Sequence, residues 1–220
     1  MKVFELVKKF VFKHKCLYSL AKTLKNRKSG KCWIENNGYT RLKKDIQGKD
    51  NYIKIDNRCT LYDTTFRIRG NNNKIIFENN CWVGENCSFW IEGNNIEIIV
   101  GEGSTFTHTV HFCAQEDYSK IIIGKDCMFS NNIIVRTSDS HPIYDLNTNI
   151  RINSAKNVIL GEHVWIAPNT KIMKGAVVGN GSIIGSDSMV SKTIPDNVLA
   201  VGHPAVVVKE NIKWTREKVF

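Results

Sequence analysis

The feature that most constrains this chain is a six-residue repeat, which begins near residue 53 and continues to about residue 190. An aliphatic or aromatic residue returns at every sixth position, and only Arg67 among these positions is polar. The positions are Ile55, Leu61, Arg67, Phe77, Val83, Phe89, Val100, Phe106, Phe112, Ile123, Phe129, Val135, Leu160, Ile166, Ile172, Val178, Ile184 and Val190. This period fits neither an α-helix nor a simple amphipathic strand, and it indicates short strands joined by corners.

The spacing between groups of repeats predicts how many sides each turn of the coil has. After every third repeat position the chain takes extra residues, first in the short polar stretches "GNNNK", "GNNIE" and "QEDYSK" and then in a much longer stretch. Insertions at every third corner predict a three-sided coil of about eighteen residues, with parallel strands ~4.8 Å apart. Gly often follows the repeat position, as in Gly101 and Gly185, where a tight corner needs a residue without Cβ. The general preference of parallel crossovers alone favours a right-handed coil.

The cysteines fit a reducing compartment. Cys59, Cys81, Cys87 and Cys127 fall at repeat positions that point inward, and no disulfide framework or CxxC metal pair is present. No run of eighteen apolar residues spans a bilayer, and the basic N-terminus has too short an apolar run for a secretory signal. We therefore expect a cytoplasmic protein.

The net charge of +10 is concentrated in the first 30 residues, which hold nine Lys and Arg against one Glu. Residues 3–25 have the spacing of an amphipathic helix with lysines on one face. The favoured interpretation is a helix that covers the open end of the coil. A basic helix at the inner face of an anionic membrane and a nucleic-acid contact are the alternatives, and for the chain as a whole we expect no nucleic-acid binding.

Residues 158–205, "VILGEHVWIAPNTKIMKGAVVGNGSIIGSDSMVSKTIPDNVLAVGHPA", resemble the hexapeptide-repeat acyltransferases, especially the bacterial sugar and polysaccharide O-acetyltransferases. The most specific part is the order of "SDSHP", "VWIAPN", "SKTIPDN" and "VGHPA". The resemblance implies an all-β fold, a left-handed parallel β-helix, which overrides the right-handed expectation. It also implies a homotrimer with sites between subunits. We thus expect an N-terminal helical segment and connection (1–52), the β-helix domain (53–208, with an extended loop 137–157) and a short C-terminal tail (209–220).

The resemblance also implies the chemistry. The acceptor is a sugar or glycan hydroxyl, the donor is acetyl-CoA, and no metal is expected. His141, which matches the catalytic histidine of such loops, would take the proton of the attacking hydroxyl, a task that suits imidazole near neutral pH. No enzyme nucleophile is needed, and no Gly-x-Ser-x-Gly motif is present. Asp139 would fix the imidazole tautomer or bind the sugar.

The remaining candidate residues divide between acceptor and donor. In the acceptor region Asp145, Asn147 and Arg151 lie along the loop, and His108 or His111 in "FTHTVHFCAQ" stands where galactoside-specific relatives have Asn, which points to a different sugar. Trp165 would pack against the thioester arm of the donor. The pantetheine channel would be lined by backbone groups around Ala167, Gly185 and Ser186, with Ser191 and Lys192 further along. Relatives have a basic residue directly after "G-x-P-A", where this chain has Val206, and Lys209 keeps the next basic position.

Three other functions remain open. A γ-type carbonic anhydrase uses the same prism, but the spacing of His108 and His111 along an extended strand places their rings on opposite faces, which does not suit a shared zinc ion. A non-catalytic scaffold does not explain the one long loop with its His-Pro pair. N-acetylation of an amino sugar, free or nucleotide-linked, is the alternative within the enzyme class.

Overall fold

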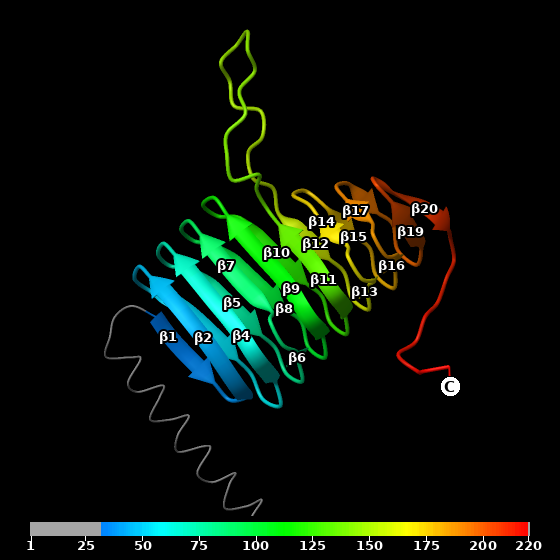
Figure 1. Ribbon diagram of the computed structural model, residues 1–220, viewed down its shortest axis with the longest axis horizontal. Coiled ribbons are helices and arrows are strands. Elements are labelled where there is room, and N and C mark those ends of the chain that lie inside the picture. Colours follow the sequence, from blue (N-terminus) through cyan, green and yellow to red (C-terminus); the bar gives the residue numbers. More distant parts are fainter. Residues whose placement is uncertain (1–31, 220) are drawn as a thin grey trace, which may run out of the picture.

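The computed structural model describes residues 32–219, and all the regular structure in this part of the chain is β. Its strands wind around one axis to form a parallel β-helix (Figure 1). The expected all-β parallel coil is therefore confirmed, whereas its left hand stays a prediction. The helix expected over residues 3–25 lies outside the described residues. Nothing within 32–219 is a helix long and apolar enough to cross a bilayer.

One side of the coil, which we call face I, is a single eight-stranded sheet. Its strands pair in parallel register, each with its equivalent in the next coil. They are β1 (Cys32–Asn36), β3 (Asn51–Ile55), β5 (Lys74–Phe77), β8 (Glu97–Val100), β10 (Lys120–Ile123), β12 (Val158–Leu160), β15 (Val177–Val178) and β18 (Thr193–Ile194).

A second sheet of twelve strands bends around a corner and forms the other two sides. Face II holds the short strands β6 (Trp82–Val83), β13 (Trp165–Ile166), β16 (Ile183–Ile184) and β19 (Leu199–Gly202). Face III holds β7 (Ser88–Glu92), β14 (Lys171–Ile172) and β17 (Met189–Val190). Four long strands contribute their first halves to face II and their second halves to face III: β2 (Tyr39–Gln47), β4 (Thr60–Arg69), β9 (Thr105–Gln115) and β11 (Met128–Arg136). The coil thus has the three sides that the repeat predicts.

The strand registers confirm the position of the insertions. Ile159 pairs with Val177, 18 positions later, which is one coil without an insertion. Ile121 pairs with Val158, so this coil holds the long loop. The short polar insertions stack along the same edge, where the Asn71 amide N–H donates to Asn94 Oδ1 at 2.9 Å. The long loop therefore leaves the prism at the edge between faces III and I.

The repeat positions form the core, as expected, with one exception. All of the apolar repeat positions are buried, whereas Arg67 is exposed and its neighbours Phe66 and Ile68 are buried instead. Phe66 pairs with Phe89, so this coil is one residue shorter than the regular count and the true core position is Phe66. Six buried phenylalanines form a continuous series of ring contacts in the interior, and the rings of Phe89 and Phe112 stack with centroids 4.8 Å apart.

Buried cysteines and corner glycines follow from the close stacking of the coils. Cys59, Cys81, Cys87 and Cys127 are buried, as expected, and all six cysteines of the described chain are free. A Cβ on Gly101 would lie 2.5 Å from the carbonyl carbon of Gly124 in the next coil, so the corner glycine is required by this approach and not by a positive φ.

The described coil begins earlier in the chain than the expected start at residue 53. Strands β1 and β2 lie within residues 1–52, so the described coil starts at Cys32, before the repeat becomes visible. β2 has no fully buried side chain, which explains why its pattern is weak. At the other end, β20 (Ala205–Lys209) pairs antiparallel with β19 and is followed by the tail.

Candidate active site

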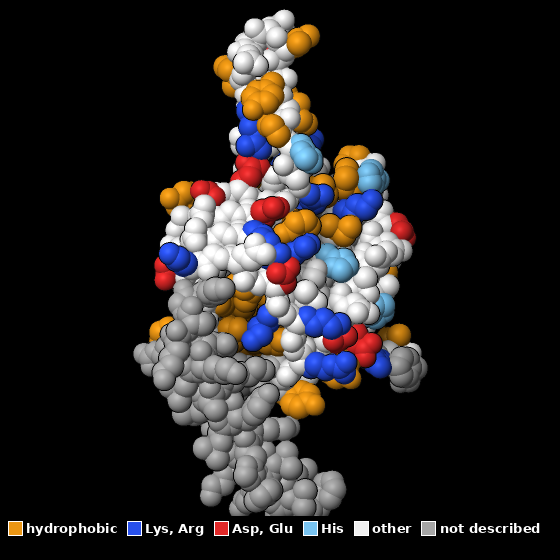
Figure 2. All heavy atoms as spheres, turned by 60° about the vertical axis from the view of Figure 1, so that its left-hand side comes forward, with side chains coloured by type: hydrophobic (Ala, Val, Ile, Leu, Met, Phe, Trp, Pro, Cys, Tyr) orange, Lys and Arg blue, Asp and Glu red, His pale blue; other side chains and the backbone are white. Residues whose placement is uncertain are grey.

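The long loop forms an arm that projects from the prism between β11 and β12 (Figures 1 and 2). Its two sides pair antiparallel, since the Ile152 N–H donates to the Ile143 carbonyl and the Asp145 N–H to the Ile150 carbonyl, both at 2.9 Å. At the tip, Asp145 Oδ1 accepts hydrogen bonds from the Thr148 N–H and hydroxyl. The arm is therefore an ordered hairpin.

The arm carries an unusual amount of exposed apolar surface (Figure 2). Leu146 at the tip is 96% exposed. The other exposed apolar side chains on the arm are Ile143, Tyr144, Ile150 and Ile152. Five such residues on one projecting hairpin are typical of a surface that another chain covers.

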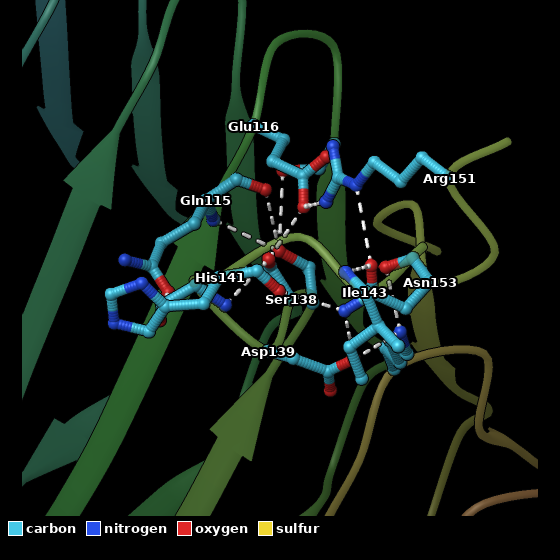
Figure 3. A network of polar contacts seen from close by, with 12 residues as sticks. Gln115, Glu116, Ser138, Asp139, His141, Ile143, Arg151 and Asn153 are labelled. Carbon is cyan, nitrogen blue, oxygen red and sulfur yellow. Dashed lines mark hydrogen bonds and ion pairs between the residues drawn. The ribbon is translucent and has the colours of Figure 1, made fainter. Parts of the chain in front are cut away.

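Asn153 connects the two sides of the arm at its base (Figure 3). Its Nδ2 donates to the His141 carbonyl at 2.8 Å and to Asp139 Oδ2 at 2.9 Å, and its Oδ1 accepts from the Ile143 N–H at 2.7 Å. Lys174 adds a second anchor, because its ammonium lies 2.5 Å from Asp139 Oδ2 and 2.8 Å from the Asn153 carbonyl. The backbone around His141 is thus held from two directions.

The preceding coil supplies the other anchors of the arm. Glu116 Oε1 accepts from the Ser138 hydroxyl at 2.6 Å and pairs with Arg151 at 2.7 Å. Gln115 Oε1 accepts from the Ser140 hydroxyl at 2.7 Å. These contacts tie both sides of the arm to the end of β9 (Figure 3).

The two carboxylates at the base are held in the ionised form. The hydrogen bond from Lys174, assisted by Asn153, lowers the pKa of Asp139 against the opposing effect of burial. The hydrogen bond from Arg151, assisted by Ser138, likewise lowers the pKa of Glu116. Both anchors therefore keep their charge at neutral pH.

His141 is exposed, and its imidazole makes no hydrogen bond within residues 32–219. Figure 3 shows the ring on the opposite side of the arm base from Arg151. The protein thus holds the His141 backbone through Asn153 while it leaves the ring available. This arrangement suits a group that exchanges a proton with a bound molecule.

Asp139 and Arg151, which we expected to act directly, both have structural partners. The Asp139 carboxylate contacts Lys174 and Asn153, so within one chain it does not hydrogen-bond the His141 ring. Arg151 pairs with Glu116. Their contact with a sugar stays a prediction.

His108 and His111 lie on either side of a corner in β9, where Thr109 has a positive φ. His111 Nδ1 is 2.8 Å from the Ser88 hydroxyl, and His108 Nδ1 is 3.2 Å from the Thr109 hydroxyl. The two rings therefore have separate partners. Among the described residues, no three His, Cys, Asp or Glu side chains are grouped so that they could hold a metal ion.

Trp165 lies far from the arm within one chain. It is half-buried and points outward from face II, because its neighbour Ile166 points into the core. Face II lies across the prism from the edge that carries His141. One copy of the chain therefore does not bring Trp165 and His141 together.

The other expected donor contacts follow face II and the C-terminal coils. The N–H groups of Ala167 and Gly185 donate to Ile184 and Ala200 in the next coil, so they are not free donors for a ligand. A Cβ on Gly185 would lie 2.5 Å from Val201 Cγ1. Ser186, Ser191, Lys192 and Lys209 are exposed, and Val206 is 59% exposed at the position where relatives have a basic residue.

Face III carries a column of polar and aromatic side chains that leads to the arm. Arg67, Trp90, Cys113 and Arg136 are register partners on four successive coils. The Arg67 guanidinium lies 5.4 Å from the centre of the Trp90 ring. Arg136 donates to the Ser140 hydroxyl at 2.9 Å, and its Nε and Trp90 Nε1 have no partner within residues 32–219.

Sequence reasoning did not identify the residues that anchor the arm. Asn153, Lys174, Gln115 and Glu116 come from separate segments, and although the last three lie within stretches quoted above, no sequence pattern gave any of the four a role in the site. The sequence offered one weak local signal, an Asn within the long loop, whose amide group needs hydrogen-bond partners wherever it is buried.

Comparison with known proteins agrees with the fold. Residues 157–192 match the family described as bacterial transferase hexapeptide (six repeats). A polysialic acid O-acetyltransferase of Neisseria meningitidis is 34% identical over 180 residues, which covers 78% of this chain and 79% of the relative. A polysialic acid O-acetyltransferase of Escherichia coli O1:K1 / APEC is 39% identical over 90 residues, which covers 41% of this chain and 29% of that relative.

Solved structures extend the likeness over most of the chain. The crystal structure of a polysialic acid-specific acetyltransferase superposes with a TM-score of 0.71 at 29% identity, over 86% of this chain and 91% of that one. A second, of a polysialic acid O-acetyltransferase, gives a TM-score of 0.58 at 30% identity, over 81% and 93% of the two chains.

Proposed function

Since this chain belongs to the bacterial transferase hexapeptide family and is an acetyltransferase, we propose that it transfers an acetyl group from acetyl-CoA to a sugar hydroxyl of a surface polysaccharide. The observation that carries the proposal is His141, an exposed imidazole whose backbone is anchored at the base of the one long loop. The similarity to enzymes named for polysialic acid O-acetylation supports a polymeric acceptor.

His141 is the proposed general base. Acetyl-CoA supplies an activated acyl carbon with a thiolate as its leaving group. The neutral imidazole accepts the proton of the acceptor hydroxyl as its oxygen attacks that carbon. When the tetrahedral intermediate collapses and the C–S bond breaks, the imidazolium returns the proton to the sulfur. No covalent intermediate with the enzyme is required.

The position of Trp165 supports a site between subunits. A donor that packs on Trp165 of one copy reaches His141 only if another copy presents its arm to face II. The exposed apolar side chains of the arm would then be covered by the neighbouring subunit. We therefore propose a homotrimer of left-handed coils in which each site takes His141 from one chain and Trp165 from the next.

The acceptor surface would be face III and the arm base. Arg67 and Arg136 supply positive charge, and Trp90 supplies an aromatic face of the kind on which sugar rings pack. His111 lies on the same face, and His108 and Arg151 border it. An acidic glycan laid along this column would meet cations on its way to His141.

The donor channel would follow face II. Trp165 would contact the thioester arm, the surfaces around Ala167, Gly185 and Ser186 would shape the channel, and Ser191, Lys192 and Lys209 would lie toward the phosphates. Because Val206 replaces a basic residue, Lys209 would carry more of the phosphate contact than in relatives. We place this reaction in the cytoplasm or at the inner face of the membrane, where the basic N-terminal segment would favour a membrane-proximal acceptor.

A thiol-release assay with acetyl-CoA tests the proposal. Polysialic acid, neutral sugars and nucleotide-linked amino sugars serve as acceptors, and the last of these tests the N-acetylation alternative. Acceptor-dependent release should fall by about 10²- to 10⁴-fold in His141→Ala and in His141→Asn, which keeps a polar side chain but no base. Coenzyme A binding should stay at the wild-type level in both. Equal release by wild type and His141→Ala would remove His141 from the mechanism.

A further inference from the structure

The C-terminal tail is a folded part of the molecule, although its sequence is mostly polar. After β20 it turns back along the outside of the prism (Figure 1) and follows the edge between faces I and II. The Ile212 N–H donates to the Asn197 carbonyl, and the following residues contact His163 and then Asp126, each on an earlier coil. The tail thus crosses several coils in the direction of the N-terminus.

Trp214 is the centre of this contact. It is only 7% exposed, and its indole stacks on the His163 ring with centroids 3.9 Å apart and an interplanar angle of 9°. Trp214 Nε1 donates to the His163 carbonyl, and His163 Nε2 is paired with the Trp214 carbonyl, both at 3.1 Å. Two reciprocal hydrogen bonds and a stacked ring pair fix the orientation of the indole.

Arg216 fastens the tail beyond this point. Its guanidinium pairs with Asp126 Oδ1 at 2.6 Å and donates to the Thr105 hydroxyl at 3.0 Å and the Cys127 carbonyl at 2.9 Å. Asp126 Oδ2 is itself paired with His163 Nδ1 at 2.6 Å. The contacts of Trp214 and Arg216 therefore form one connected unit, which we call the tail clasp.

The tail clasp borders Trp165. The rings of Trp165 and Trp214 lie with centroids 5.8 Å apart at 47°. Along the coil axis Trp165 has Met128 and Ile183 as register partners on either side. Trp214 closes a third, lateral side, so the indole of Trp165 is bounded on three sides and keeps its outer face free.

We propose that the tail clasp positions the donor half of the site, with Trp214 acting through Trp165. This inference rests on the proposed function, in which the pantetheine arm packs on Trp165. A flat apolar contact gives a reproducible thioester position only if the ring that provides it has one orientation. The tail supplies that constraint without itself touching the reacting atoms, so Trp214 is a positioning residue.

Coenzyme A titration by calorimetry, together with steady-state kinetics of the full chain, tests this. In Trp214→Ala the Kd for coenzyme A and the KM for acetyl-CoA should rise by roughly 3- to 10-fold, the range of one lost aromatic pair. The KM for the acceptor should not change, and Trp214→Phe should restore most of the loss. Lys213→Ala is the matched control, because its exposed side chain lies in the same tail.

A double-mutant comparison separates positioning from general stabilisation. If Trp214 acts through Trp165, then Trp214→Ala should add little to the loss already caused by Trp165→Ala. Should Trp214→Ala fail to fold, Arg216→Ala, which frees the same tail, carries the same expectation. Fully additive losses would overturn the inference.

Two further outcomes have distinct meanings. Wild-type coenzyme A affinity in Trp214→Ala would overturn the inference and leave the proposed function intact. Tighter binding in Trp214→Ala would also overturn it, because the tail would then be a cover over the site. A wild-type protein that binds no coenzyme A would instead refute the proposed function, because this measurement needs no acceptor.

Discussion

Asn153 gives the sharpest test of how the arm is held. In Asn153→Ala the base of the arm loses the bonds to the His141 carbonyl, Asp139 Oδ2 and the Ile143 N–H. It also loses a weaker contact with Arg151 at 3.3 Å. Each such bond contributes about 0.5–1.5 kcal/mol net, and water can solvate part of what is exposed, so the anchored arm should lose about 2–4 kcal/mol.

This loss should appear in activity much more than in global stability. The coil core does not include Asn153, so the Tm should fall by only a few degrees. The His141 ring would no longer be held in its place relative to the donor, and a displacement of about 1 Å lowers the reaction rate on the order of 100-fold. We therefore expect kcat to fall about 10- to 100-fold while coenzyme A affinity is preserved.

The assay is the thiol-release rate at saturating acetyl-CoA, combined with hydrogen exchange of residues 143–152. Asn79→Ala is the matched control, since Asn79 is exposed at a remote corner. Asn153→Asp should be at least as impaired, because it removes both donors and places a second carboxylate beside Asp139. A wild-type kcat in Asn153→Ala would refute the reasoning, as would slow exchange of the arm in a variant that has lost activity.

Three further predictions concern the arm and the core. Glu116→Gln and Arg151→Gln should show a coupling of only about 0.2–1 kcal/mol in arm hydrogen exchange, because the pair is partly solvated, and additive effects would show that the ion pair contributes nothing. The pKa values of Asp139 and Glu116 are lowered, so their contribution to anchoring is present above the ordinary carboxyl range and is lost as pH falls through the lowered values. The protection of the arm amides, measured relative to their intrinsic exchange rate, should therefore stay high from pH 7 to 5 and fall below about pH 4. In Lys174→Met this loss of protection should move to higher pH, and an unchanged midpoint would contradict the prediction. Phe89→Ala should destabilise the coil by about 3–5 kcal/mol in urea unfolding, and a change below about 1 kcal/mol would contradict the tight packing of its ring against three other phenylalanines.

The repeat by itself determined most of the fold. A six-residue period with insertions at every third corner leaves few ways to bury one residue in six, so three sides, the inward residues and the edge with the long loop followed directly. The prediction was wrong at Arg67, where the count is one residue short and Phe66 occupies the core. It also missed β1 and β2, because an outer coil with few buried side chains shows little periodicity.

The sequence predicted a smaller part of the candidate site than of the fold. His141 and Trp165 could be named from motifs, because local segments carry the resemblance. The anchors Asn153, Lys174 and Glu116 could not, since most of their partners are 10 to 35 positions away and their contacts depend on side-chain geometry across coils. The docked tail was equally hidden, apart from the lone Trp214 in a polar segment.

Only the tertiary structure therefore decided how the residues of the candidate site are placed relative to one another. Periodicity along a chain specifies which side chains point inward, because burial is a local property of each coil. It does not specify that Trp165 and His141 lie on opposite sides of one prism, nor that Trp214 returns to border Trp165. Those relations arise from the stacking of whole coils, where residues distant in sequence meet at spacings set by the strand separation.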